Sequence, residues 1–237
     1  MIQICNFGFT YPNGKKAVSD LNLTIEPGDL FAFIGHNGAG KTTTIKAMVG
    51  ILDFKEGDIL IFDKSIKKEP LECKKELAFI PDNPDLYDSL TGNQYLNFVA
   101  DIFNIDSVTR KELIEQYAKE FEIYDDLTSQ IASYSHGMKQ KLAIISALIH
   151  NPKILVLDEP FVGLDPKATY MVKQIMHRFC ENGGIIFFST HVLDVAEKLC
   201  NKIAIIKEGK LIKTGKMEEV VQDSSLEEVF LELTDNA

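Results

Sequence analysis

Residues 35–42 read Gly35-His36-Asn37-Gly38-Ala39-Gly40-Lys41-Thr42, and they follow the apolar run from Leu30 to Ile34. The spacing fits the pattern G-x-x-x-x-G-K-[ST], in which glycines let the backbone curl with its N–H groups directed inward at the start of a helix. Such a nest binds phosphate oxygens, and the helix dipole favours their negative charge. The stretch therefore predicts a phosphate-binding loop, the P-loop, between a strand and a helix.

The side chains at the end of the P-loop suit a nucleoside triphosphate with Mg²⁺. Lys41 is placed to reach the β- and γ-phosphates, the Thr42 hydroxyl to ligate Mg²⁺, and Thr43 to hydrogen-bond a phosphate oxygen. The alternative is a Gly-rich turn in which Lys41 is an ordinary solvated cation. The apolar run before the motif and the helical segment after it favour the nucleotide site.

Composition limits the class of protein. With 237 residues, 45% of them apolar, the chain is long enough to bury the core of one large domain. The 35 acidic and 25 basic residues give a net charge of −10, which opposes non-specific binding to nucleic acid or to anionic lipid. We therefore expect no nucleic-acid partner.

Cysteine usage and the apolar runs indicate a cytoplasmic location. The four cysteines are widely spaced and form no C-x-x-C pair, so they predict reduced thiols rather than a disulfide framework or a zinc site. Residues 1–12 lack the features of a signal peptide, and no apolar run approaches the roughly 18 residues that a spanning helix needs. If the protein works at a membrane, we expect another chain to hold it there.

The order of segments predicts an α/β fold with a mixed or parallel core sheet. Residues 1–34 alternate in hydropathy between turns and predict an N-terminal antiparallel β lobe, whereas residues from about 91 to 150 show helical periodicity. We predict a single domain over 1–237, whose divisions follow in chain order. The RecA-like core with its β lobe takes 1–82 and 151–215, a helical insertion takes about 83–150, and a helical tail takes 216–237.

Secondary-structure expectations outside the β lobe are specific. Strands are predicted at 77–80, 154–157 and 185–188, with a hairpin over 203–213, and helices at 94–103, 111–121, 137–149, 166–180, 192–200 and 226–233.

Two carboxylates follow a buried strand. Asp158 and Glu159 come directly after the apolar run from Ile154 to Leu157, at the end of a strand where ligands sit in open α/β sheets. We expect Asp158 to hold magnesium, directly or through water, and Glu159 to act as general base toward the attacking water. The alternative is a polar loop after a buried strand, but a P-loop requires an acidic strand end elsewhere.

Three further positions are weaker candidates when taken alone. His191 ends the strand from Ile185 to Thr190, which would bring it beside the γ-phosphate, although a lone histidine is more often a surface or core residue. Tyr11 lies at the edge of the β lobe, where it either stacks on adenine or packs a hairpin. Ser135 is a plausible N-cap of the last helix of the insertion, which makes a second anion-favouring helix start.

Taken in order, these residues resemble the ATP-binding subunits of ABC transporters over nearly the whole chain. Tyr11 matches the adenine-stacking aromatic, residues 35–42 the Walker A loop, and His191 the switch histidine. The remaining matches are the signature sequence at Tyr134-Ser135-His136-Gly137-Met138, the Walker B end at Asp158-Glu159, and the D-loop at Gly163-Leu164-Asp165.

The resemblance implies a head-to-tail dimer that encloses two ATP molecules with Mg²⁺. The signature residues Ser135, His136, Gly137 and Met138 of one subunit would then face the ATP bound at Lys41 of the other. Whether the second subunit is an identical chain is left open. ATP-driven closure would drive an integral membrane permease, which in this family docks near residues 81–87, so the subunit would be a peripheral protein at the cytoplasmic face of the membrane.

Three departures from the family pattern stand out. Asp82 occupies the position of a glutamine that would contact magnesium, which a carboxylate can still do through water. His136 replaces the first signature glycine, and Met138 replaces the signature glutamine.

Two functions remain open from the sequence. The run from Ser135 to Gln140 and the ending from Leu226 to Leu231 are similar to the drug, antibiotic and lipid exporter branch, which implies an export ATPase. The alternative is a soluble ABC-type ATPase that remodels a protein or cofactor-assembly complex, and cell fractionation distinguishes the two.

Overall fold

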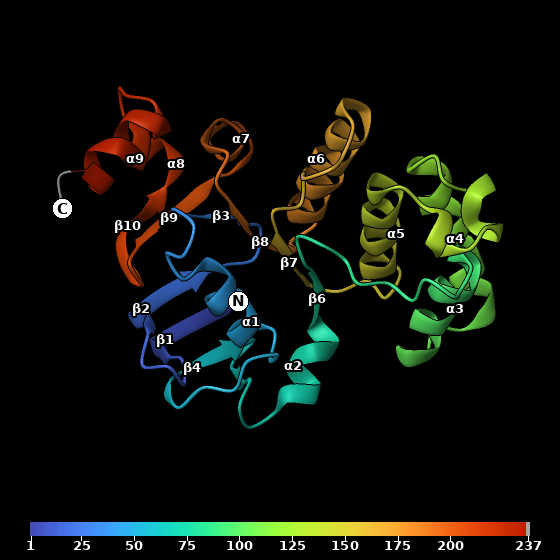
Figure 1. The fold of residues 1–237 in the computed structure, drawn as a ribbon, viewed down its shortest axis with the longest axis horizontal. Helices are drawn as coiled ribbons and strands as arrows, with labels where there is room; N and C mark the ends of the chain where they lie inside the picture. Colours follow the sequence, from blue (N-terminus) through green and yellow to red (C-terminus); the bar gives the residue numbers. More distant parts are fainter. Residues whose placement is uncertain (236–237) are drawn as a thin grey trace.

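The structure, a computed structural model that describes residues 1–235, contains two β-sheets (Figure 1). The smaller is antiparallel, with strand order β2-β1-β4-β5. Its strands are β1 (Ile2–Thr10), β2 (Lys16–Ile25), β4 (Glu56–Ile61) and β5 (Lys64–Ser65). This sheet confirms the predicted N-terminal β lobe.

The larger sheet has the order β10-β9-β3-β8-β7-β6, and all its pairs are parallel except the β9–β10 hairpin. Its strands are β3 (Leu30–Ile34), β6 (Leu77–Ile80), β7 (Ile154–Asp158), β8 (Ile185–Thr190), β9 (Lys202–Lys207) and β10 (Lys210–Lys216). The mixed core sheet of an α/β fold is therefore confirmed. Because β3, β7 and β8 are parallel neighbours, their carboxyl ends meet at one edge of the sheet.

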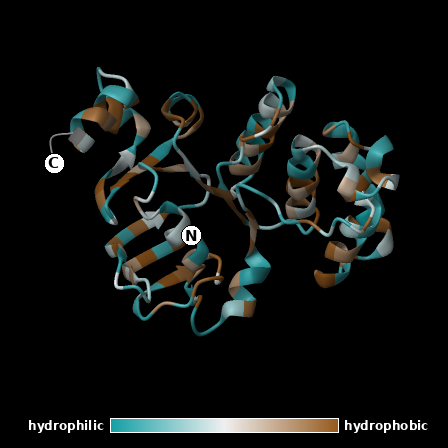
Figure 2. Ribbon diagram, in the orientation of Figure 1, coloured by the Kyte–Doolittle hydropathy of each residue, from teal (hydrophilic) through white to brown (hydrophobic). Residues whose placement is uncertain are grey.

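The helices fall largely where periodicity places them. They are α1 (Lys41–Met48), α2 (Pro70–Glu76), α3 (Gly92–Ile102), α4 (Ser107–Glu120), α5 (His136–Leu148), α6 (Pro166–Glu181), α7 (Leu193–Leu199), α8 (Met217–Val221) and α9 (Leu226–Asp235), with short 3₁₀ turns at Asp125–Thr128 and Ile131–Ser133. Periodicity did not predict α2 or α8. Hydrophilic residues cover α2 (Figure 2), and its one buried side chain is Cys73, so it carries almost no apolar stripe. Residues 236–237 of the predicted tail lie outside the described residues.

Strand β3 separates two hydrophobic cores because successive side chains of a strand point to opposite faces. Phe31 and Phe33 lie in the core shared with the antiparallel sheet, where both rings pack on Phe187 of β8. Ala32 and Ile34 lie in the opposite core, shared with α6 and α7. Helix α1 buries its apolar residues in the first of these cores, so the helix that follows the P-loop is held by packing against the sheet.

Helices α3, α4 and α5 lie together to one side of the sheets (Figure 1). Each begins at a capping side chain. Thr91 forms a capping box with Gln94, Asp106 accepts from two backbone N–H groups, and Ser135 accepts from the backbone N–H of Met138. The expected N-cap role of Ser135 is confirmed. No helix within residues 1–235 is both long enough and apolar enough to cross a membrane.

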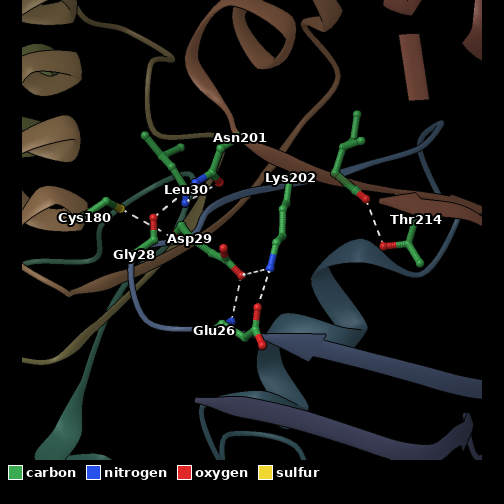
Figure 3. Close-up of polar contacts among 9 residues, drawn as sticks. Glu26, Gly28, Asp29, Leu30, Cys180, Asn201, Lys202 and Thr214 are labelled. Carbon is green, nitrogen blue, oxygen red and sulfur yellow. Dashed lines mark hydrogen bonds and ion pairs between the residues drawn. The ribbon is translucent and has the colours of Figure 1, made fainter. Parts of the chain in front are cut away.

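A polar network around the buried Asp29 side chain links the turn that leads into β3 to β9 (Figure 3). The Asn201 side chain accepts from the backbone N–H of Leu30 at 3.0 Å, and the Lys202 ammonium contacts Glu26 at 2.7 Å and Asp29 at 3.0 Å. The Asp29 side chain is only 7% exposed, so its charge needs such a partner. The network holds β3 in register with β9 and so helps to fix where the P-loop begins.

Candidate functional site

Gly40 shapes the P-loop at the start of α1. It is the N-cap residue, with φ of 112°, and a Cβ at this position would lie 2.7 Å from the carbonyl oxygen of Ala17. A glycine N-cap has no side chain to bond the free N–H groups of the first helical turn. Those groups are therefore free to bind phosphate oxygens, as the sequence predicts.

Lys41 lies inside the loop rather than in solvent. Its side chain is 7% exposed, and its ammonium donates to the carbonyl oxygens of Gly35 at 2.7 Å and of His36 at 3.2 Å. Burial lowers the pKa of Lys41, while the nearby carboxylates of Glu159 and Asp158 act in the opposite direction. This excludes the alternative of an ordinary solvated cation, because the ammonium is held where phosphate oxygens would replace the two carbonyls.

The Thr42 hydroxyl and the Asp158 carboxylate meet at the carboxyl edge of the sheet. Thr42 donates to one Asp158 oxygen at 3.1 Å, and the Ser189 hydroxyl donates to the other. Hydroxyl and carboxylate oxygens are ligands that Mg²⁺ accepts, usually with water and nucleotide phosphates completing its shell. No cluster of three or more His, Cys, Asp or Glu residues within residues 1–235 could hold a metal by itself. The donor set therefore fits Mg²⁺ that arrives with a nucleotide.

Glu159 and His191, predicted separately at two strand ends, contact each other in the structure. Glu159 has φ of 50°, an uncommon value for a residue with a side chain, and its N–H donates to the carbonyl of Ser189 at 3.1 Å. One carboxylate oxygen lies 2.8 Å from Nδ1 of His191, and the other accepts from the Thr190 hydroxyl at 3.1 Å. The carboxylate is thus held at two points beside the P-loop.

These groups surround a cavity of about 290 Å³. It is lined by Tyr11, Lys15, Ala17, Asn37, Gly38, Gly40, Lys41, Thr42, Thr43, Asp82, Asp158 and Glu159. Two larger cavities, of about 560 and 600 Å³, lie beside Lys202 and beside Arg178, but neither is lined by the P-loop. The P-loop cavity therefore has the phosphate-binding backbone, although it is not the largest.

Tyr11 and Asp82 lie at the borders of this cavity. The Tyr11 ring packs edge-on against Phe9, is 37% exposed, and its hydroxyl bonds to the Thr43 hydroxyl at 2.9 Å. An exposed ring face at the cavity leaves room for a stacked base, although the ring also packs the hairpin. The Asp82 carboxylate also lines the cavity, where it accepts from the backbone N–H of Asn83 at 2.9 Å. Among the described contacts, it has no direct bond to Thr42 or Asp158.

The signature lies away from this cavity. Of the described residues that line it, none belongs to the stretch from Ser135 to Met138. Instead, Gly163 has φ of 79°, and a Cβ there would overlap the ring of His136. The D-loop residue Asp165 caps α6 by accepting from the N–H of Ala168 at 2.8 Å. The signature therefore packs on the D-loop of its own chain and leaves Ser135 exposed.

Sequence reasoning missed four residues of the site. Ser189 orients Asp158, Thr190 orients Glu159, and Lys15 and Ala17 line the cavity. The first two had a usable signal, because Ser189 and Thr190 are the polar residues that end the apolar strand before His191. Lys15 had none, because it is one exposed lysine in a turn.

Comparison with known proteins agrees with this geometry. The ABC transporter family model matches residues 18–162. The chain is 38% identical to YhcH, an uncharacterized ABC transporter ATP-binding protein of Bacillus subtilis, over 91% of this chain and 68% of that protein. It is 35% identical to the bacitracin transport ATP-binding protein BcrA of Bacillus licheniformis, over 84% of this chain and 64% of that protein. A solved structure described as the ATP-binding subunit of an ABC transporter superposes with a TM-score of 0.94 at 30% identity, covering 99% of each chain. The chain therefore belongs to the ABC transporter family of ATP-binding, ATP-hydrolysing subunits.

Proposed function

We propose that this chain hydrolyses ATP to drive export through a separate membrane permease. The observation that carries the proposal is the meeting of Lys41, Thr42, Asp158 and Glu159 around one cavity at the carboxyl edge of the core sheet. This arrangement supplies a phosphate-binding cation, oxygen ligands for Mg²⁺ and a carboxylate for the attacking water.

Each residue has a distinct part in the reaction. The N–H groups at the start of α1 and the Lys41 ammonium bind the phosphates. Thr42 and Asp158 would hold Mg²⁺, which would supply positive charge beside the phosphates. Asp82 would contact the Mg²⁺ through a water molecule. Glu159 takes the proton of the attacking water, and His191 orients Glu159 through the 2.8 Å contact. Tyr11 binds the base.

Within one chain, the signature residues do not line the P-loop cavity among the described residues. Ser135 begins a helix whose first turn favours anions, yet it lies outside the P-loop cavity of its own chain. In the proposed ATP-bound dimer, Ser135, His136, Gly137 and Met138 approach the γ-phosphate at the partner's P-loop. The contact of His136 with Gly163 links this approach to the D-loop of the same chain.

The proposal includes a transport direction and a location. BcrA, named for bacitracin transport, supports the transport role, and the similarity of residues 135–140 and 226–231 to the exporter branch supports export. Residues from about 83 to 150 act as a helical subdomain that moves relative to the core of residues 1–82 and 151–215. The subunit then works at the cytoplasmic face of the membrane, held there by its permease.

Two measurements test this proposal. The purified chain should release phosphate from ATP in the presence of Mg²⁺, and chelation of Mg²⁺ should abolish the release. Purification from detergent-solubilised membranes should bring a polytopic membrane protein with the chain. Recovery of the chain in the soluble fraction of the cell, bound to no membrane protein, would contradict the transport assignment.

A further inference from the structure

The C-terminal helix packs against the P-loop although the two are far apart in the chain. The Phe230 ring of α9 lies 4.9 Å from the His36 ring, centroid to centroid, with the ring planes at 61°. Phe230 is 6% exposed, so its ring is fixed in the core. An aromatic edge contact of this kind is directional and restrains the more exposed partner, which here is the His36 side chain.

Two hydrogen bonds within the P-loop end at the backbone of His36. Its carbonyl oxygen accepts from the Lys41 ammonium at 3.2 Å and from the N–H of Ala39 at 3.1 Å. A shift of the His36 backbone would therefore move both the phosphate-binding cation and the curl of the loop.

A second contact joins α9 to the other flank of the loop. The carbonyl oxygen of Thr234 accepts from the Lys207 ammonium at the end of β9. Two residues further on, the N–H of Gly209 donates to the carbonyl of Ala39 at 2.9 Å. Helix α9, which lies beside α8 and the β9–β10 hairpin (Figure 1), thus contacts the P-loop directly at His36 and through the hairpin at Ala39.

We propose that Phe230 is a positioning residue for ATP, which holds His36 and hence the P-loop in the conformation that binds phosphate. The inference rests on the proposed function of the P-loop. A loop that is already ordered loses less conformational entropy when it binds, so its affinity is higher. Phe230 does not touch the nucleotide cavity, and its effect is on binding rather than on the chemical step.

The test measures the affinity of the purified chain for AMP-PNP with Mg²⁺ by titration calorimetry. Phe230→Ala should raise the Kd about three- to tenfold, the range expected for loss of one aromatic pair. ATPase assays should show a rise in KM of similar size with a nearly unchanged kcat. Phe230→Leu keeps an apolar side chain in the core and should raise the Kd to a similar extent, which guards against a folding defect in the alanine variant.

Leu226→Ala is the matched control. Leu226 is fully buried on the same helix, but among the described contacts only the Phe230 ring packs on His36. Leu226→Ala should lower the melting temperature as Phe230→Ala does while leaving the Kd unchanged. In a His36→Ala background, Phe230→Ala should add little further loss of affinity, because the two residues act through one contact.

The outcomes separate the two proposals. Equal Kd values for wild type and Phe230→Ala would overturn the inference, as would an equal rise in Kd from Leu226→Ala. Failure of the wild-type chain to bind AMP-PNP at all would instead overturn the proposed function.

Discussion

The helix that follows the P-loop and the helix that begins at the signature differ in how their N-termini are capped. Helix α1 begins at Gly40, which has no side chain to cap it, and its first turn lines the P-loop cavity together with the carboxylates of Asp158 and Glu159. Helix α5 begins at Ser135, whose hydroxyl accepts from the backbone N–H of Met138, and both Ser135 and His136 are exposed. The first site is assembled within one chain, whereas we propose that the second is completed by a phosphate held at the P-loop of a partner subunit.

The difference has a physical cause. An uncapped helix start leaves its first N–H donors free to bind a ligand or water. A serine cap satisfies one donor and makes the helix start stable without a ligand. Helix α5 can therefore stay ordered while its subunit is alone, and then contact a phosphate held by a partner.

The largest expected effect comes from the α1 side. Lys41→Ala should abolish detectable nucleotide binding, because it removes the charge-assisted bonds to the phosphates. Lys46→Ala, an exposed lysine on the same helix, should bind ATP as wild type does. Calorimetric titration with ATP and a melting curve for each variant check this, and wild-type turnover by Lys41→Ala would remove the P-loop assignment.

The next largest effect separates binding from chemistry at the same site. Glu159→Gln should bind MgATP but hydrolyse it about 10² to 10⁴ times more slowly, since an amide cannot accept the proton of the attacking water. Loss of one negative charge near the triphosphate should also favour an ATP-bound dimer. A phosphate-release assay with size-exclusion chromatography in MgATP measures both. Hydrolysis at the wild-type rate would move the role of base to Asp82 or to His191.

The α5 side should show the opposite pattern. Ser135→Arg should change the ATP affinity of a single chain less than about twofold, because Ser135 lies outside the P-loop cavity, but it should prevent dimerisation of Glu159→Gln in MgATP. Ser107→Arg, at the exposed start of α4, is the control and should leave the dimer intact. An unchanged dimer fraction with Ser135→Arg would count against the shared site.

The smallest effect concerns the free energy of unfolding, through a contact between the C-terminal ends of α3 and α5. His150 stacks on Phe103 with ring centroids 3.7 Å apart, and burial lowers the pKa of His150 from 6.5 to about 4. Below pH 6.5 the unfolded chain takes up a proton that the folded chain refuses, so the contribution to stability falls as pH falls from 6.5 toward 4.

Urea unfolding at pH 7 and pH 5 measures this effect. From pH 7 to pH 5, the free energy of unfolding of His150→Gln should fall by about 1 to 2 kcal/mol less than that of the wild type, since glutamine does not titrate. An identical pH dependence in both proteins would show that His150 is not kept neutral by the fold.

The two regions also differed in how far the sequence predicted them. The P-loop and the Asp158-Glu159 strand end were predicted from residue spacing, because phosphate and magnesium chemistry constrain both residue type and position. The left-handed backbone of Glu159 was not, since it depends on how β7 meets β8. The hydroxyls of Ser189 and Thr190 were overlooked, although both residues end the apolar strand before His191. The packing of His136 on Gly163 could not be predicted either, because it joins segments whose spacing carries no pattern.

The most direct test of the account is whether two inactive chains complement each other. Lys41→Ala lacks a working P-loop and Ser135→Arg lacks a working signature, so a dimer containing one of each has one complete site. Each variant alone should show no ATP-dependent turnover, and an equimolar mixture should recover up to about a quarter of the wild-type phosphate release, since half of the dimers are mixed. A mixture no more active than its components would contradict the claim that the site is completed by a second subunit.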